Sequence, residues 1–136
     1  MFYVLLVNGA AFSWKAQLSS IIATSTAEAE LLSLGVAVQE TMWARQLAHE
    51  LSFTQLLPTS IYEDNHACIK MTHKELNRSR SKHMHLKYCF IHHHYSNGTF
   101  DAIAVASADQ VADVGTALRP VPQFERCTRV MRGENA

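Results

Sequence analysis

The chain has 136 residues, 48% of them hydrophobic, and its twelve Lys and Arg balance twelve Asp and Glu, so the formal net charge is zero at pH 7. This length and composition fit one folded domain with a real core and argue against a disordered protein. The neutral balance does not favour or exclude a nucleic-acid partner. Three widely spaced cysteines give no disulfide framework, which suits a reducing, intracellular compartment.

The first elements in chain order are two apolar runs, residues 2–7 and 10–14. Asn8-Gly9 lies between them, and this pattern predicts a β-hairpin. The opening run has no basic leading segment and is too short for a secretory signal or a membrane span. We therefore expect an intracellular protein, cytoplasmic or nuclear, that is not secreted and has no membrane partner.

A long helix is predicted from about residue 26 to 51, because apolar side chains recur there at helical spacing, at Leu31, Leu34, Val38 and Met42. This broad apolar face suits a helix that lies on a sheet. Gly35 inside the helix should cost about 1 kcal/mol relative to alanine.

The second half predicts a strand over residues 59–63, a short helix to about residue 73, and a helix from about 81 to 95. Residues 99–107 alternate as in a strand, and residues 107–118 open another helix. Pro120 and Pro122 end this pattern, so we expect a domain over residues 1–118 and a polar tail over 119–136. The order of elements predicts an α/β fold, a mixed sheet with helices on its faces.

Three acids lie at the ends of predicted elements, at Glu28, Asp64 and Asp113. Carboxylates from separate elements suit Mg²⁺, and the end of a strand is a common ligand position in open α/β sheets. Each acid also has a purely structural interpretation. Ser25 and Glu28 fit the capping box S-x-x-E, and Asp64-Asn65 fits a helix N-cap. The residues alone leave both interpretations open.

A basic segment, residues 70–87, carries six Lys and Arg against one acid, Glu75. It is either a solvated helix face and loop or a patch that attracts phosphates. The chain also has eight histidines, and His85 and His92 fall near one face of a helix. A transition-metal site is therefore a further alternative, although no Cys-x-x-Cys or His-x-x-x-His spacing supports it.

Several segments, in order, resemble the ribonuclease H domain at the end of copia-type LTR retrotransposon Pol polyproteins. The family's "SSTEAEYIAL" is similar to "STAEAELLSL", its "CDNQSAI" to "SIYEDNHACIKM", and its "HSRTKHIDIRYHFIRE" to "NRSRSKHMHLKYCFIHHHYSNGTF". Its "EDQLADIFTKAL" is similar to "SADQVADVGTAL", and the flanking segments match as well. The order and spacing hold from about residue 3 to 127.

The resemblance implies a ribonuclease H-like mixed sheet flanked by helices, and Mg²⁺-dependent cleavage of the RNA strand of an RNA–DNA hybrid. In the family, four carboxylates hold two Mg²⁺ ions. By motif, Glu28 matches the helix glutamate, Asp64 the strand-end aspartate and Asp113 the aspartate of the last helix. These three are the implied catalytic and metal-binding residues, and Glu30 falls outside the set.

The resemblance also implies contacts to nucleic acid and a protein partner. The family's "SRTKH" segment and its neighbours place the implied nucleic-acid contacts at Arg78, Arg80, Lys82, His83 and Lys87. The implied protein partner is the reverse transcriptase part of the polyprotein.

One departure from the family pattern concerns the first ligand. The family carries its first aspartate on a central first strand, in a "D-A-D-W-A-G"-like segment, but residues 1–24 contain no acid. We therefore expect an N-terminally truncated fold without that strand and with one catalytic Asp missing. Residues 4–7 would then have an unpaired edge. We expect little or no nuclease activity, and the alternatives are a non-catalytic nucleic-acid-binding remnant or, less favoured, a His-rich metal-binding protein.

Overall fold

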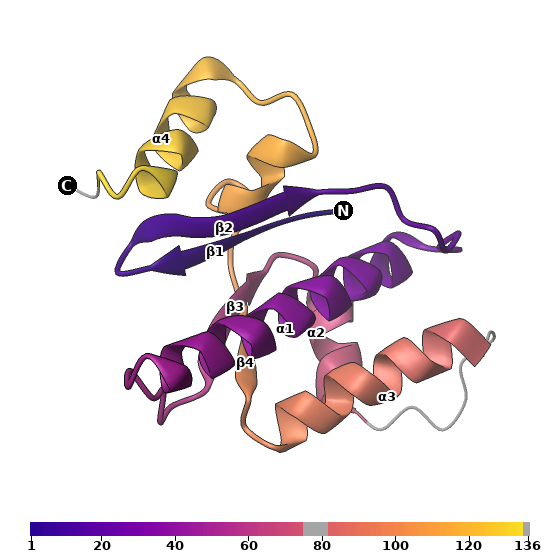
Figure 1. The fold of residues 1–136 in the computed structure, drawn as a ribbon. Coiled ribbons are helices and arrows are strands. Elements are labelled where there is room, and N and C mark those ends of the chain that lie inside the picture. Colours follow the sequence, from indigo (N-terminus) through magenta and orange to yellow (C-terminus); the bar gives the residue numbers. More distant parts are fainter. Residues whose placement is uncertain (75–81, 135–136) are drawn as a thin grey trace.

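The computed structural model describes residues 1–74 and 82–134 and has an α/β architecture (Figure 1). Its elements are β1 (Phe2–Val7), β2 (Ala10–Ala16), α1 (Thr26–Glu50), β3 (Thr59–Glu63), α2 (His66–His73), α3 (Lys82–Ser96), β4 (Phe100–Ala104), the 3₁₀ helix η1 (Val111–Gly115) and α4 (Val121–Met131). The predicted order of strands and helices is confirmed as far as β4.

The predicted hairpin is confirmed, because β1 and β2 pair antiparallel across the turn at Asn8 and Gly9. Both turn residues have positive φ, 51° and 82°. Asn-Gly tolerates this conformation better than most residue pairs, and the resulting turn matches the twist of the two strands. The register shifts between Leu5 and Leu6, so the regular part of β1 ends there.

The predicted single mixed sheet is not what the described residues form. They contain two separate two-stranded sheets, β1 with β2 and β3 with β4, and the second pair is parallel. The reason is that no described strand lies between β1 and β3 to join them. Parallel pairing of β3 and β4 requires a crossover, which α2 and α3 supply.

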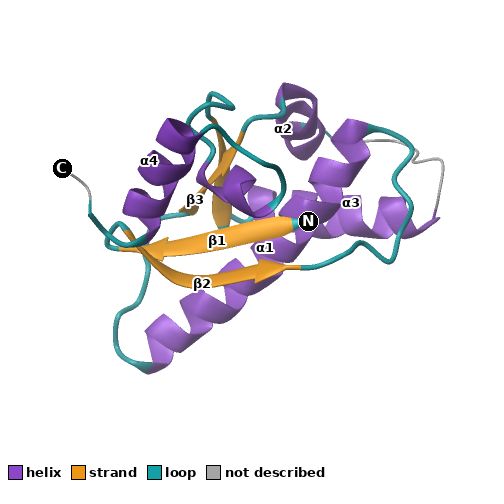
Figure 2. Cartoon of the chain, turned by 90° about the horizontal axis from the view of Figure 1, so that it is seen from above, coloured by secondary structure: helices purple, strands orange, loops and turns teal. Residues whose placement is uncertain are grey.

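Helix α1 lies between the hairpin and α3 (Figures 1 and 2). Its apolar residues form the centre of the core with residues of α2, α3 and β4: Leu31, Leu32, Leu34, Val38, Cys68, Ile91 and Phe100. Gly35 is buried where α1 meets α3, and a Cβ at this position would lie 3.5 Å from Ile91 Cδ1, an ordinary contact distance. The predicted apolar face therefore packs mainly on α3 rather than on a sheet.

Two expectations for the C-terminal part are wrong. The helix predicted over 107–118 is only the short η1, because Gly115 and the approaching Pro120 do not favour continuation. The polar tail contains α4, in whose first turn Pro122 is tolerated because that N–H has no helical partner. Cys127 of α4 is buried.

No helix in the described part of the chain is both long enough and apolar enough to cross a membrane.

Candidate functional site

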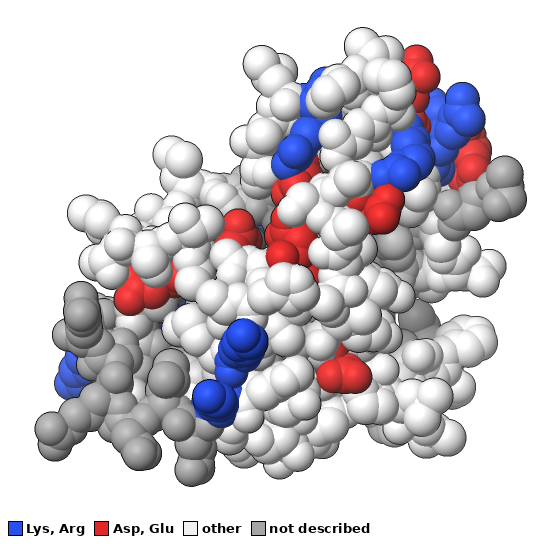
Figure 3. Space-filling model, turned by 180° about the vertical axis from the view of Figure 1, so that it is seen from behind, with Lys and Arg blue, Asp and Glu red and all other residues white. Residues whose placement is uncertain are grey.

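A cavity of about 680 Å³ lies between β1, β3, α1 and residues 105–116. Most of β1 and β3 and one face of α1 line it, so it occupies the space between the two small sheets. Its acidic lining residues are Glu30, Glu63, Asp64, Asp109 and Asp113. Acidic side chains gather near the middle of the face in Figure 3, below a group of basic ones. The cavity therefore brings five acidic side chains of the described residues to one place.

The acids reach the cavity from three different elements. Glu30 lies early in α1, Glu63 ends β3 with Asp64 directly after it, and Asp113 lies in η1. The carboxyl end of a strand in an α/β fold is where ligands commonly bind. The sequence prediction that Asp64 follows a strand is confirmed.

Glu63 is the most buried of these acids, with 6% of its surface exposed. The pKa of Glu63 is raised to about 7, mainly by burial; the hydrogen bond from the backbone N–H of Asn65 lowers this pKa, and the charges of Glu30, Asp64 and Asp113 raise it. That N–H donates to Glu63 Oε1 at 3.0 Å. Near neutral pH this carboxyl is therefore partly protonated, unlike an exposed glutamate.

Glu30 and Asp113 share this negative environment. Burial raises the pKa of Glu30, and the charges of Asp64 and Asp113 raise it further. Burial also raises the pKa of Asp113, while the ion pair with Arg119 acts in the opposite direction. The mutual repulsion means that a cation in the cavity would favour the charged forms of both groups.

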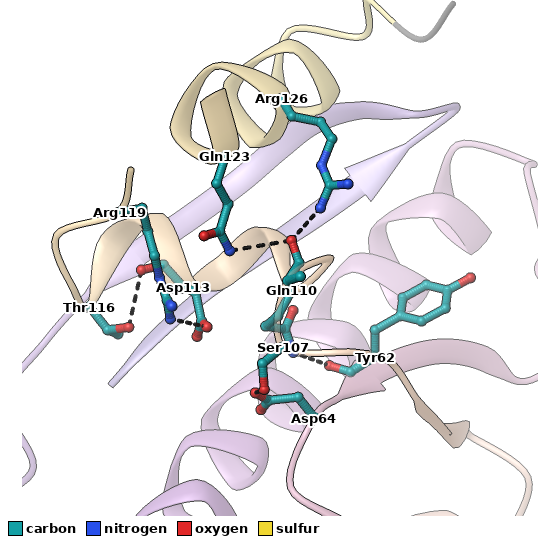
Figure 4. Close-up of polar contacts among 10 residues, drawn as sticks. Tyr62, Asp64, Ser107, Gln110, Asp113, Thr116, Arg119, Gln123 and Arg126 are labelled. Carbon is teal, nitrogen blue, oxygen red and sulfur yellow. Dashed lines mark hydrogen bonds and ion pairs between the residues drawn. The ribbon is translucent and has the colours of Figure 1, made fainter. Parts of the chain in front are cut away.

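Two further contacts fix the orientation of the lining (Figure 4). The hydroxyl of Ser107 donates to Asp64 Oδ2, and Gln110 Nε2 donates to the backbone oxygen of Tyr62 at 3.0 Å. Helix α4 supports this segment, because Arg126 forms an ion pair with Asp109. The loop after β4 is therefore held against the end of β3.

Glu28 does not line the cavity. Its Oε2 accepts from the N–H and the hydroxyl of Thr24, at 2.7 and 2.5 Å, and its own N–H donates to Ser25 Oγ at 3.2 Å. This is a capping arrangement close to the one that the S-x-x-E pattern predicts. The structure thus brings Asp64 and Asp113 to one cavity and places Glu30, not Glu28, beside them.

Helical periodicity is the signal that distinguishes the two glutamates. Residues two apart on an α-helix point about 200° from each other, so Glu28 and Glu30 cannot share a face. Glu30 lies on the same face as Ser33, Ala37 and Thr41, which also line the cavity. The sequence pattern alone did not show which face would meet the cavity.

The spacing of the donor side chains bears on metal binding. Carboxylate oxygens suit Mg²⁺, but across residues 1–74 and 82–134 no three His, Cys, Asp or Glu side chains are gathered closely enough to hold one ion. The same holds for the described histidines. His85 Nε2 lies 3.5 Å from Cys89 Sγ on α3, which provides two donors and not the four of a structural zinc site.

The implied nucleic-acid contacts fall on α3 and before it. Lys82 and His83 are exposed in its first turn, and Lys87 is half-buried. Arg78 and Arg80 lie outside the described residues. The positive residues that can be placed are therefore on α3, which packs on α1 and not on the cavity lining.

Comparison with known proteins finds similarity to retrovirus-related Pol polyproteins of plant transposons. The chain is 25% identical over 129 residues to that of transposon TNT 1-94 of Nicotiana tabacum, a match that covers 95% of this chain and 10% of the relative. It is 29% and 28% identical over 114 residues to those of transposons RE2 and RE1 of Arabidopsis thaliana, covering 84% of this chain and 8% of each relative.

The matched region is a small part of each relative. The chain spans about a tenth or less of the length of the relatives it matches. No family model matches it, and no solved structure matches it. The homologues of this chain are thus plant retrotransposon Pol polyproteins, and the sequence is similar to one short region of them.

Proposed function

We propose that the chain is a ribonuclease H-type fragment of a retrotransposon Pol polyprotein, with little or no nuclease activity of its own. One observation carries this proposal: acids from three separate elements line one cavity at the carboxyl end of β3, in a chain whose homologues are Pol polyproteins. The proposed substrate is the RNA strand of an RNA–DNA hybrid. The proposed partner is the reverse transcriptase part of the same polyprotein, and the proposed location is intracellular.

We propose that Glu30, Asp64 and Asp113 attract Mg²⁺ to the cavity only weakly, with Glu30 in the role that the motif gave to Glu28, because no three described acids lie close enough to hold one ion together. The ion would supply a Lewis acid for a phosphoryl oxygen and a more acidic bound water. The described acids are not gathered around one point, and Arg119 already pairs with Asp113. These two facts support weak ion binding and low activity.

The chain's own residues would orient the reacting groups. Ser107 fixes the carboxylate of Asp64, and Arg119 forms an ion pair with Asp113 that offsets its charge. Glu63, with a pKa of about 7, would hold or release a proton beside them near neutral pH. Each of these roles follows from a contact that the folded chain already makes.

The test of activity is digestion of a labelled RNA–DNA hybrid with Mg²⁺, comparing the protein with Asp64→Asn. We expect no cleavage above the level of that variant. The expected loss of activity would be wrong if the protein cleaved the hybrid clearly in the presence of Mg²⁺, if Asp64→Asn abolished this cleavage, and if the Asp101→Asn variant still cleaved. Asp101 is a suitable control because it is exposed on β4 and does not line the cavity.

The test of the site is a Mg²⁺ titration followed by NMR of side-chain carboxyl carbons. The signals of Glu30, Asp64 and Asp113 should move together at millimolar Mg²⁺, whereas the Glu28 signal should not. Movement of the Glu28 signal with those of Asp64 and Asp113 would restore the assignment made from the motif. If none of these signals moves, the proposed ion site is refuted.

A non-catalytic nucleic-acid-binding role is the second candidate, favoured by the exposed Lys82 and His83 at the start of α3. Binding to a short RNA–DNA hybrid should weaken with salt, by a slope of about one in log K per phosphate contact. The double variant Lys82→Gln and Lys87→Gln should reduce this slope, and Lys15→Gln on β2 should not. Binding that does not depend on salt would count against this role.

A further inference from the structure

We propose that His85 and Cys89 on α3 form a reversible binding site for a zinc ion. The two residues are one helical turn apart, and they direct a ring nitrogen and a sulfur toward each other. Helix α1 lies between α3 and the hairpin (Figures 1 and 2), and no described residue of α3 lines the acidic cavity. The zinc site is therefore separate from the carboxylates proposed to attract Mg²⁺.

The distance between the two donor atoms is the first support for this site. His85 Nε2 lies 3.5 Å from Cys89 Sγ. Zinc binds imidazole nitrogen at about 2.0 Å and thiolate sulfur at about 2.3 Å, so at a tetrahedral angle the two donors lie about 3.5 Å apart. The folded chain thus holds nitrogen and sulfur at the separation that one zinc ion requires. Without an ion, the same contact is a weak hydrogen bond between the thiol and the imidazole.

An added ion can reach this pair from solvent. Cys89 is exposed and is not part of a disulfide, whereas Cys68 and Cys127 are buried. His85 is half-buried beside it. On binding, the thiol would lose its proton to water, and the sulfur and the neutral imidazole would each donate an electron pair to the ion. Water would fill the remaining coordination positions.

The types of donor favour zinc over magnesium. Thiolate and imidazole suit zinc, whereas Mg²⁺ prefers oxygen ligands. Helix α3 contains no Asp or Glu from Lys82 to Ser96, so it offers no carboxylate to a hard cation. Lys82 and Lys87 add positive charge to the same helix, which opposes any cation that is attracted by charge alone. Binding here would therefore depend on coordination by nitrogen and sulfur.

The structure also distinguishes two histidines that the sequence spacing makes equivalent. His85 and His93 each lie four residues from Cys89, so either could share a helix face with the thiol. His93 Nε2 instead lies 3.0 Å from the side-chain amide nitrogen of Asn97, one turn further along the chain. The His93 ring is thus directed away from Cys89, and His85 is the partner that the folded chain selects.

Two features indicate a weak site that exchanges its ion. No third His, Cys, Asp or Glu joins the pair within residues 1–74 and 82–134, whereas structural zinc sites have four ligands. His85 Nδ1 is buried and has no hydrogen-bond partner among the residues that the structure describes. An acceptor at this nitrogen typically strengthens metal binding by about 10–100-fold. We therefore expect a dissociation constant for Zn²⁺ of about 1–100 µM.

The test uses Co²⁺ as a probe of the reduced protein. A bond between thiolate and Co²⁺ absorbs in the near ultraviolet, whereas zinc gives no such band, and Zn²⁺ generally binds the same donors more tightly than Co²⁺. We expect a band that saturates at millimolar Co²⁺ and that Zn²⁺ removes by competition. An excess of Mg²⁺ should leave the band unchanged.

Three variants assign the donors. Cys89→Ser should abolish the band. His85→Gln should weaken binding of Co²⁺ and Zn²⁺ at least about tenfold, whereas the matched control His93→Gln should change it by less than about threefold. All three positions are exposed or half-buried, so the variants should keep the fold, and circular dichroism would verify this.

A measurement on the unchanged protein makes the assignment independent of the variants. In NMR spectra, millimolar Zn²⁺ should shift the imidazole signals of His85 and leave those of His93 in place. Zinc should also raise the midpoint of thermal unfolding, because it binds the folded chain, and the Cys89→Ser variant should not respond.

Several outcomes would overturn the proposal. They are a band that persists in Cys89→Ser, a band that Mg²⁺ removes, and equal weakening by His93→Gln and His85→Gln. The absence of any band at millimolar Co²⁺, with the His85 signals unmoved by Zn²⁺, would overturn it as well. Failure of hybrid cleavage or of Mg²⁺ binding would leave these readouts unaffected, so the nuclease proposal and the zinc proposal fail separately.

Discussion

Replacing Glu63 by glutamine should stabilise the folded protein above neutral pH and change its stability little in acid. Burial raises the pKa of Glu63 from 4.5 to about 7 in the folded chain. In the unfolded chain the carboxyl returns to its ordinary value. Between these two pH values the folded state holds a proton that the unfolded state has released, so the free energy of unfolding falls as pH rises.

The size of the effect follows from the pKa difference. The folded and unfolded pKa values differ by about 2.5, and each unit corresponds to about 1.4 kcal/mol, which gives an upper estimate of about 3–4 kcal/mol. The stabilisation is fully present below the unfolded pKa and is lost as the pH rises through about 7. Glutamine keeps an oxygen that can accept the N–H of Asn65 and carries no charge, so it should remove this loss.

The assay is urea unfolding followed by tryptophan fluorescence at several pH values between about 5 and 8. We expect Glu63→Gln to exceed the wild type by about 1–3 kcal/mol at the upper end and to match it closely at the lower end. Asp101→Asn, an exposed carboxyl on β4, is the control and should follow the wild type. The reasoning would be refuted if Glu63→Gln lost as much stability with rising pH as the wild type.

The remaining predictions concern the cap, the helix contact and the ion pair. Glu28→Ala should lower the free energy of unfolding by about 1 kcal/mol, measured by urea unfolding, because it removes a capping contact. Gly35→Ala should raise it by up to about 1 kcal/mol in the same assay, since the added methyl meets Ile91 at an ordinary distance. An unchanged or lower value would contradict this. Arg119→Ala should raise the pKa of Asp113 further, because the ion pair lowers it, and carboxyl NMR titration would show the shift.

The local elements could be predicted because their causes are local. Asn8-Gly9 specifies a turn with two positive φ angles, and the interval between apolar residues specifies α1. The strand before Asp64 could be predicted because residues with a high β propensity stand directly before the start of a helix. The pattern does not predict helix α4, because Pro120 and Pro122 indicate the end of a helix, although proline in a first helical turn is compatible with one.

Turn chemistry and side-chain periodicity act over a few residues, so they specify the two hairpin strands, the long helix and the position of Asp64 at a strand end. The position of Glu30, rather than Glu28, with Asp64 and Asp113 depends instead on how the elements pack together. Side chains point in all directions around a helix. Because α1 packs against α3 on one side and against β1 on another, this packing decides which face of α1 meets the cavity. The cavity between β1 and β3 is likewise a property of the tertiary structure, because it depends on where the two sheets lie and not on either strand alone.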